Sequence, residues 1–213
     1  MTEGEQVKSL THDFLLVGVG GQGTLLAADV VALVGMEMGC DVKKSEVHGM
    51  AQRGGSVTSH VRWGEHVHSP LISPGQVDFF VAFERLEALR HANMLRADGK
   101  ALINDYRIVP VSVTTGNGRY PTEEDEARAY AAMASSPYYL PAIEIAERAG
   151  NPRVNNVVML GALAVFLDVP EEVWQEVITR RVPQRFVAVN QRAFAEGRAE
   201  MMARLRAREH RAS

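Results

Sequence analysis

Short apolar runs alternate with longer stretches of helical periodicity along the first half of the chain. Residues 13–19 and 77–83 are rich in Leu, Val and Phe and have the length of buried strands. Residues 24–38 repeat apolar positions at helical spacing, and Gly39 is a suitable helix stop. A further strand is predicted at residues 41–47. The order strand, helix, strand is typical of an α/β protein.

The middle of the chain adds an alternating segment and a second helix-strand pair. Residues 56–70 alternate on both sides of Gly64–Glu65, which predicts a β-hairpin. Residues 85–96 predict a helix, followed by a turn at Asp98–Gly99. Residues 100–105 then predict another strand. Because a hairpin is antiparallel, the sheet is expected to be mixed rather than purely parallel.

The remaining chain is predicted to be helical after a long connection that begins near Pro110. Thr122 is placed to cap a helix over residues 122–134, whose first turn is acidic. Further helices are predicted at residues 141–150 and 155–168, after Pro170, and after Pro183. Together the patterns predict a three-layer α/β/α sandwich with a mostly parallel, mixed sheet and a helical C-terminal third. We expect a single domain over residues 1–213, with its core at about 13–197.

Composition excludes several classes of protein. The chain has 213 residues, 46% of them hydrophobic and 23% charged, with a formal net charge of −3. Such a chain has no general electrostatic attraction to nucleic acid or to an anionic membrane. Its single cysteine, Cys40, excludes an internal disulfide and a four-cysteine iron–sulfur or zinc site built from this chain alone. The polar N-terminus does not resemble a secretory signal, so we expect a cytoplasmic protein.

A glycine-rich loop separates the first predicted strand from the first predicted helix. Gly18, Gly20 and Gly23 have the spacing G-x-G-x-x-G. Glycines there allow a tight turn and a close approach of the backbone to a ligand, and the helix N-terminus attracts an anion. The loop therefore either binds a phosphate or other anion or only turns the chain.

An NAD(P)-dependent dehydrogenase is the less favoured interpretation of this loop. A dinucleotide site needs an acidic residue at the end of the second strand to bind the ribose hydroxyls. Asp41 begins the second predicted strand instead of ending it, and Glu46 ends that strand but comes late. A hairpin also follows where a second strand-helix unit is required.

A second glycine cluster follows in the segment KKSEVHGMAQRGGSVTSHVRW, residues 43–63. His48 precedes it, and Arg53 is followed directly by Gly54 and Gly55. A guanidinium beside exposed backbone donors suits a carboxylate or phosphate. The alternative is a tight turn with Arg53 in a structural ion pair.

The two clusters together resemble a known family. GVGGQGTLLAADVVA followed at this distance by EVHGMAQRGGSV resembles the gamma-type subunit of the 2-oxoacid:ferredoxin oxidoreductases. The form HGMAQRGG resembles the indolepyruvate branch most, since Met50 and Ala51 stand where pyruvate-type and 2-oxoglutarate-type members have Pro-Glu. The later stretch NNVVMLGALAVFLDVP also resembles the family, and the likeness covers about residues 14–197.

This resemblance implies an accessory subunit of an enzyme that is inactive alone. The family decarboxylates a 2-oxoacid oxidatively, transfers the acyl group to coenzyme A (CoA) and reduces ferredoxin. Thiamine diphosphate, Mg²⁺ and the iron–sulfur clusters are expected on a larger partner chain, and this chain is expected to hold no metal or catalytic residue. Residues expected to face a CoA phosphate or the partner chain are Gly18, Gly20, Gly21, Gln22, Gly23, Thr24, His48, Gln52, Arg53 and Gly54. The alternative is a free-standing nucleotide- or CoA-binding regulatory module.

Several other residues are weaker candidates. Cys40 could be a reactive thiol, and His66 and His68 could chelate a metal from one face of a strand. Asn104–Asp105 ends a strand where α/β sheets place ligands. The arginine-rich helix after Pro183 has no accompanying aromatic platform, so we expect no nucleic-acid binding.

Overall fold

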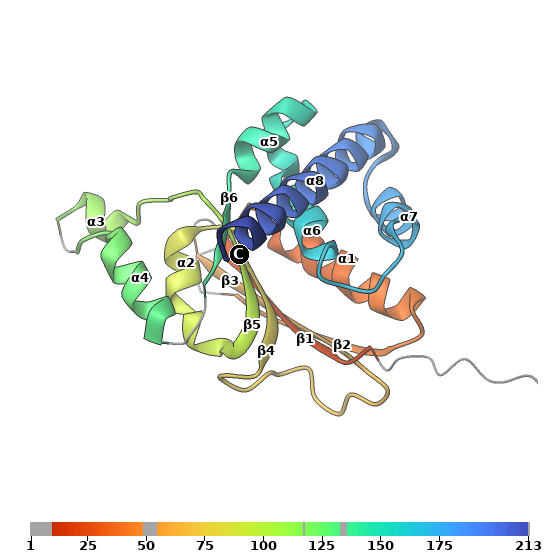
Figure 1. The fold of residues 1–213 in the computed structure, drawn as a ribbon, viewed down its shortest axis with the longest axis horizontal. Helices are drawn as coiled ribbons and strands as arrows, with labels where there is room; N and C mark the ends of the chain where they lie inside the picture. Colours follow the sequence, from red (N-terminus) through yellow and green to blue (C-terminus); the bar gives the residue numbers. More distant parts are fainter. Residues whose placement is uncertain (1–9, 49–54, 117, 133–135, 213) are drawn as a thin grey trace, which may run out of the picture.

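The computed structural model describes residues 10–48, 55–116, 118–132 and 136–212. Its six-stranded sheet has the order β2-β3-β1-β4-β5-β6 (Figure 1). β1 pairs in parallel with β4, β4 with β5 and β5 with β6, whereas β3 is antiparallel to both β1 and β2. The strands are β1 (His12–Val19), β2 (Asp41–His48), β3 (Ser56–Gly64), β4 (Val77–Ala82), β5 (Leu95–Asn104) and β6 (Tyr138–Leu140). The sheet is therefore mostly parallel and mixed, as predicted.

Helices cover both faces of the sheet, unequally. The helices are α1 (Thr24–Glu37), α2 (Arg85–Arg90), α3 (Val111–Thr114), α4 (Glu123–Ala132), α5 (Ala142–Ala149), α6 (Asn155–Ala164), α7 (Glu171–Arg181) and α8 (Val187–Ala212). In Figure 1, α1 and α6–α8 lie on one side of the sheet, and α2 and α4 lie on the other. The three-layer α/β/α prediction is confirmed.

The alternation of side chains along β1 divides the core into two parts. Phe14 and Leu16 point to the α1 side, where the larger hydrophobic cluster lies. Leu15 and Val17 point to the α2 side and the smaller cluster. All four side chains are fully buried, so β1 lies at the centre of the molecule.

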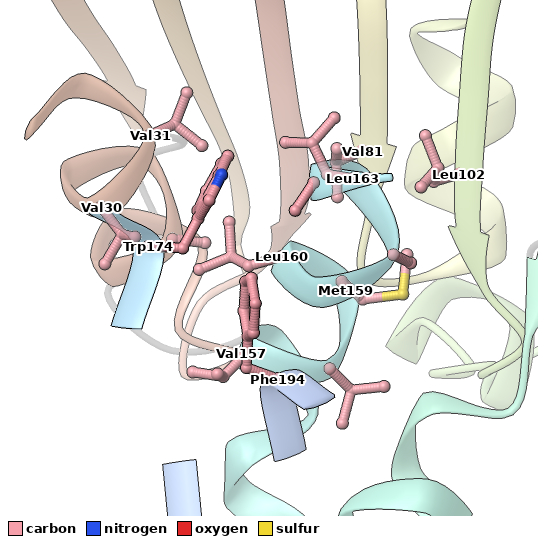
Figure 2. Packing of buried hydrophobic residues seen from close by; sticks show 14 of the residues in the cluster. Val30, Val31, Val81, Leu102, Val157, Met159, Leu160, Leu163, Trp174 and Phe194 are labelled. Carbon is pink, nitrogen blue, oxygen red and sulfur yellow. The ribbon is translucent and has the colours of Figure 1, made fainter. Parts of the chain in front are cut away.

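The larger cluster is a contact of five helices, α1 and α5–α8, with the sheet. Figure 2 shows Trp174 of α7 and Phe194 of α8 against Leu160 of α6, beside Val30 and Val31 of α1. The two aromatic rings are stacked with centroids 5.9 Å apart. Burying side chains of this size stabilises the fold by about 2–3 kcal/mol each. The apolar residues all around α6 are explained by its position between the sheet and α8.

The predicted hairpin over residues 56–70 is wrong. β3 ends at Gly64 and pairs with β2 in an unbroken register in which Asp41 lies opposite Gly64. The chain after β3 is an irregular connection, in which the Val67 N–H donates to the Asp41 carboxylate. An alternation of polar and apolar residues indicates that the two faces of a strand differ in exposure. It does not indicate which other strand pairs with it.

Other element boundaries also differ from the predictions. The helix predicted to reach Arg96 ends at Arg90, because Leu95 already begins β5 beside Val77. Asp98–Gly99 therefore lies within β5, where the ladder with β4 shifts register, and not in a turn before it. Neither β6 nor α3 was predicted, because three or four residues give too short a pattern to recognise.

Thr122 caps α4 as predicted. Its Oγ accepts the N–H of Asp125, whose carboxylate accepts the N–H of Thr122 in return. None of the helices in the described ranges has the length and hydropathy needed to cross a bilayer.

Candidate functional site

The glycine loop joins β1 to α1 through two residues with positive φ. Gly21 has φ +102° and Gly23, the residue before α1, has φ +80°. These values lie in the region that glycine adopts without strain. A Cβ on Gly23 would also lie 2.5 Å from Nδ2 of Asn156, which donates to the Gly23 carbonyl. The glycines are thus required by backbone shape and by the contact with α6.

Gln22 closes the loop with both ends of its side-chain amide. Its Oε1 accepts the Val19 N–H at 2.7 Å, and its Nε2 donates to the Phe83 carbonyl at 2.8 Å. The Gln22 N–H donates to the Val19 carbonyl. The side chain therefore holds the turn and connects the end of β1 to the end of β4.

That connection lies at the point where the sheet changes its winding. β1 leads into α1 on one face and β4 leads into α2 on the other, although the two strands are parallel neighbours. Ligands of open α/β sheets bind in the crevice at the carboxyl ends of two such strands. The loop is therefore at the position in the fold where a ligand is expected.

Gly55, the last residue of the second glycine cluster, bonds to the first loop. The Gly20 N–H donates to the Gly55 carbonyl at 2.9 Å, next to the first residue of β3. Ser56 Oγ in turn donates to Glu87 of α2. His48 is the last residue of β2, opposite Val57. Gln52, Arg53 and Gly54 lie outside the described residues.

The N-terminus of α1 has unused polar capacity. Among the described residues no side chain caps it, and none beyond its chain neighbours has an atom within 4 Å of a Cβ built on Gly21. Thr24 is only 3% exposed, and its Oγ1 has no hydrogen-bond partner among the described residues. An open helix N-terminus with an unpaired hydroxyl can donate hydrogen bonds to an anion.

Next to this loop, the end of β4 carries a buried carboxylate. Glu84 is 1% exposed, caps α2 through the Glu87 N–H, and also accepts the Ile108 N–H and the Tyr120 hydroxyl. This is the acidic residue that follows the parallel neighbour of β1. Because the carboxylate oxygens of Glu84 are buried and already accept hydrogen bonds, Glu84 cannot bind a ribose. Asp41 and Glu46 lie on β2, two strands away from β1, and so are not at this position either. These facts argue against the dinucleotide interpretation.

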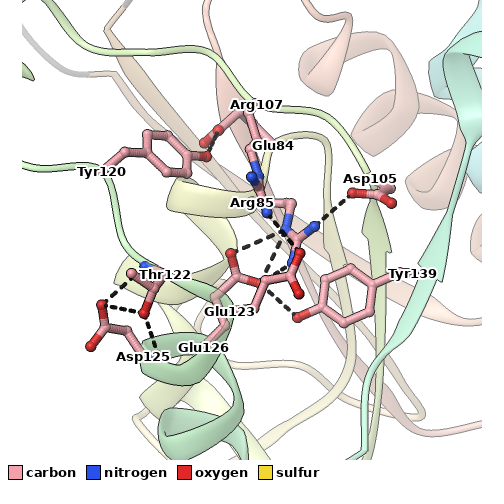
Figure 3. A network of polar contacts seen from close by, with 10 residues as sticks. All are labelled: Glu84, Arg85, Asp105, Arg107, Tyr120, Thr122, Glu123, Asp125, Glu126 and Tyr139. Carbon is pink, nitrogen blue, oxygen red and sulfur yellow. Dashed lines mark hydrogen bonds and ion pairs between the residues drawn. The ribbon is translucent and has the colours of Figure 1, made fainter. Parts of the chain in front are cut away.

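Beside Glu84, a polar network centred on Arg85 and Glu126 joins α2, α4, β6 and the chain after β5 (Figure 3). Arg85 donates to Glu126 through Nε and Nη2 and to Asp105 through Nη1, and Tyr139 donates to Glu126. Burial alone lowers the pKa of Arg85, but the two carboxylates raise it by more, so the pKa lies above its ordinary value. Burial, with the Glu126 charge, raises the pKa of Tyr139. The network lines a cavity of about 580 Å³.

The structure gives the weaker candidates structural partners. Asn104 is buried between the Phe83 carbonyl and the Ala142 N–H, and the Asp105 carboxylate accepts from Arg85. Burial raises the pKa of the Cys40 thiol, which donates to the Leu10 carbonyl, so it is a poor nucleophile.

The histidines and arginines singled out in the sequence also lie at the surface or in helix contacts. His66 and His68 are exposed on the irregular connection after β3, not on a strand. Arg208 near the end of α8 stacks on Tyr138, with its guanidinium carbon 3.7 Å from the ring centroid. Arg204 pairs with Glu200 one turn away on the same helix.

Two residues at the loop were not predicted from the sequence. Asn156 holds Gly23 from α6, and Glu84 holds the chain around residues 108–120. A polar Asn at the start of an otherwise apolar helix was the available signal for the first. Glu84 follows a buried strand, which is the corresponding signal for the second.

Two solved structures that share this fold are subunits of oxidoreductases. The gamma subunit of a keto/oxoacid ferredoxin oxidoreductase from Geobacter sulfurreducens superposes with a TM-score of 0.67 at 24% identity, covering 90% of this chain and 99% of that one. A pyruvate oxidoreductase subunit from Thermotoga maritima gives 0.66 at 22% identity, with 88% and 94% covered. The fold is therefore that of these small subunits.

The chain belongs to the pyruvate ferredoxin/flavodoxin oxidoreductase family, whose model matches residues 13–200. The indolepyruvate oxidoreductase subunit IorB of Thermococcus kodakarensis is 38% identical over 196 residues, covering 87% of this chain and 94% of that protein. IorB of Archaeoglobus fulgidus is 38% identical over 188 residues, with 87% and 92% covered. The resemblance to this family, including its indolepyruvate branch, is confirmed.

Proposed function

We propose that this chain is the smaller subunit of an indolepyruvate ferredoxin oxidoreductase. The complex oxidatively decarboxylates an aryl 2-oxoacid in the cytoplasm and yields acyl-CoA, CO₂ and reduced ferredoxin. Support comes from the relatives named IorB, which match over nearly their whole length. The chain acts as an accessory subunit and is inactive alone.

The groups that carry electrons and stabilise the carbanion reside on a larger partner chain in this proposal. A four-cysteine cluster does not fit a chain whose only cysteine is Cys40. Within the described ranges no cluster of three or more His, Cys, Asp or Glu could hold a metal ion. The donor set of this chain therefore supports an accessory role, with thiamine diphosphate, Mg²⁺ and iron–sulfur clusters held by the partner.

The glycine loops of this chain bind a phosphate of CoA at the sheet's switch point. One observation supports this part: the hydrogen bond from Gly20 to Gly55 joins the last residue of the second glycine cluster to the loop that precedes α1. The unpaired hydroxyl of buried Thr24 fits an anionic ligand. Arg53 supplies the guanidinium, and Gly18, Gly21, Gln22, Gly23, His48, Gln52 and Gly54 shape the surface.

A structural neighbour is consistent with this ligand. A 2-oxoglutarate:ferredoxin oxidoreductase from Magnetococcus marinus, solved with 2-oxoglutarate, CoA and succinyl-CoA bound, has a TM-score of 0.66 at 20% identity. This chain is covered to 91%, but it corresponds to 31% of that longer chain. The remainder of the longer chain has room for the functions that we assign to a separate partner.

Co-expression with the larger subunit tests the proposal. The purified complex should be brown and should reduce ferredoxin with indolepyruvate only when CoA is present, whereas the small chain alone should be colourless and inactive. A chain that binds CoA but captures no large subunit would instead be the free-standing regulatory module. Tight NADH binding by the isolated chain would support the dehydrogenase.

Substitution of Arg53 tests the assignment of the loop. In the assembled complex, Arg53→Ala should raise KM for CoA about tenfold or more, as expected for losing a charge-assisted hydrogen bond. Arg148→Ala, on the exposed side of α5, is the matched control. An unchanged KM for CoA together with unchanged assembly would remove Arg53 from the site.

A further inference from the structure

The two edges of the sheet differ in what covers them. β6 is three residues long, and Arg208 from α8 donates to the carbonyls of Ser136 and Pro137 at its start. β2 is eight residues long, and no described strand pairs with its outer side. A strand edge presents unpaired N–H and C=O groups, which form a template for a further strand.

The hydrogen bond between Gly20 and Gly55 determines which groups of β2 point outward. Residues of an antiparallel pair alternate between hydrogen-bonded and non-hydrogen-bonded positions. Since Gly55 bonds to the β1 side, residues 57, 59, 61 and 63 of β3 also face β1, and residues 58, 60 and 62 face β2. Their partners on β2 are Val47, Ser45 and Lys43. The backbone groups of the other four positions therefore point outward, at Val42, Lys44, Glu46 and His48.

The side chains of β2 carry both signs of charge. The strand has two acids, Asp41 and Glu46, and two bases, Lys43 and Lys44, and it contains no proline. Its ladder with β3 runs without a register shift. Charged side chains, lysines above all, usually protect an edge strand against pairing, as do prolines and bulges. β2 has no proline or bulge, and its charges run acid, base, base, acid, so that an antiparallel second copy can set opposite charges against each other. Within one chain, Lys44 also donates to Glu46 and to Asp29 of α1.

We propose that β2 is the surface through which two copies of this chain pair, antiparallel, around a twofold axis at Ser45. The two six-stranded sheets then join into one. In this register Lys44 lies opposite Glu46 of the second copy, and Glu46 opposite its Lys44. The outward backbone groups of these positions bond to each other.

Neighbouring registers are unfavourable. If one strand shifts by one residue, the outward N–H and C=O groups of one copy lie opposite residues whose own groups point inward to β3. The hydrogen bonds between the two β2 strands then cannot form. The two next allowed registers set Lys44 opposite Lys44 or Glu46 opposite Glu46, which places like charges together. Only the register centred on Ser45 satisfies both the backbone and the charges.

The other face of the strand also fits this arrangement. Val47 is 54% exposed in the single chain. In the proposed pair it lies opposite Lys43, whose apolar stem can cover it. Ser45 meets its own copy at a non-hydrogen-bonded position, where Cα atoms approach to about 4.5 Å and a small side chain is required. The pairing does not depend on which reaction the complex performs.

Charge variants of the full chain test the pairing through sedimentation equilibrium at low salt. The unmodified chain should reach dimer as its concentration rises. Glu46→Lys places two lysines opposite each other across the axis, and Lys44→Glu places two glutamates opposite each other. Each variant alone should therefore dissociate at least about tenfold more readily. An equimolar mixture of the two variants restores opposite charges at both pairs of facing positions, because one strand then carries two lysines there and the other carries two glutamates. The mixture should dimerise as well as the unmodified chain.

A disulfide trap tests the register even if a charge variant folds poorly. In a Cys40→Ser background, Ser45→Cys should form an intermolecular disulfide under mild oxidation, because its Cα separation suits the bond. Val47→Cys, on the same face of the same edge, lies opposite Lys43 and should not. A chain that stays monomeric at all concentrations, equal cross-linking of the two variants, or charge variants that dimerise as tightly as the unmodified chain would each overturn the proposal.

Discussion

At the scale of single residues, amide side chains satisfy backbone groups that a glycine loop cannot satisfy by itself. Gln22 bonds the backbone of Val19, at the end of β1, and of Phe83, just after β4, and Asn156 bonds the carbonyl of Gly23. A carboxamide has both donors and an acceptor, so one side chain can satisfy groups of opposite kind. The loop therefore keeps its shape without a ligand.

Gly23→Ala should destabilise the protein by about 3 kcal/mol, because the strain of a positive φ adds to a clash with Asn156. Gly39→Ala is the matched control: Gly39 has the same φ of +80°, but no atom of the described residues beyond its chain neighbours lies within 4 Å of the new Cβ. The control should cost about 1–2 kcal/mol, which is the backbone strain alone. Urea unfolding measures both, and equal losses would show that Asn156 yields without cost.

At the scale of elements, two helices meet through glycine. A Cβ on Gly161 of α6 would lie 2.0 Å from the Phe194 carbonyl oxygen, and one on Gly197 of α8 would lie 2.0 Å from that of Val158. The backbones of the two helices are therefore in contact. This approach brings Phe194 against Trp174 within the larger core.

Gly161→Ala separates helix propensity from packing. Propensity alone favours alanine by about 1 kcal/mol, whereas overpacking against a rigid backbone costs about 3 kcal/mol. We expect a net loss of stability in thermal or urea unfolding, and the same result for Gly197→Ala from the opposite helix. A gain in stability for either variant would mean that the helices can move apart freely.

His60 on β3 should make stability depend on pH. Burial, with the positive charges of His91 and Arg62, lowers the pKa of His60 below 6.5, and its Nδ1 accepts the Ile72 N–H. Between pH 6.5 and the lower pKa of the folded state, His60 is protonated in the unfolded chain but not in the folded chain. Stability is therefore full above pH 6.5 and falls as the pH decreases through this window.

His60→Gln should flatten this dependence, because the amide oxygen can still accept the Ile72 N–H but takes up no proton. Unfolding free energies between about pH 7.5 and pH 5.5 measure the change in slope. His68→Gln, at an exposed position of the connection after β3, is the matched control. If the two variants have equal slopes, His60 is not the group responsible.

At the scale of the whole molecule, an ion pair joins the segment around α4 to the sheet. Arg85 at the start of α2 is 10% exposed and Glu126 of α4 is 3% exposed at the side chain. Tyr139 of β6 completes the contact, with the Arg85 guanidinium carbon 4.7 Å from its ring centroid. The smaller helical layer therefore depends on a buried pair as well as on its apolar cluster.

A double-mutant cycle measures that dependence. Arg85→Met alone leaves Glu126 buried without its cation and should cost about 3–5 kcal/mol. Arg85→Met combined with Glu126→Leu should recover most of this loss, because apolar side chains of similar size pack in place of the pair. Losses that simply add in urea unfolding would show that the two groups are not coupled.

The sequence by itself determined the features that depend on neighbours along the chain. The patterns of residues 13–19, 24–38 and 41–47 predicted the strand, helix and strand that form there, and Thr122 caps its helix through residues of the following turn. The glycine spacing placed the loop between a strand and a helix. The two glycine motifs in register also identified the family, because a resemblance of this kind needs no coordinates.

Only the tertiary structure decided which distant segments meet. The alternation around β3 left its partner open, and the partner is β2 rather than the chain after Gly64. Leu95 begins a strand because Val77 lies beside it, and β6 exists because β5 offers a free edge. Gln22 could be recognised as a clamp only once Phe83 was placed next to it. Hydrogen bonds and contacts between strands far apart in sequence select these partners, and no local pattern of hydrophobic residues records that choice.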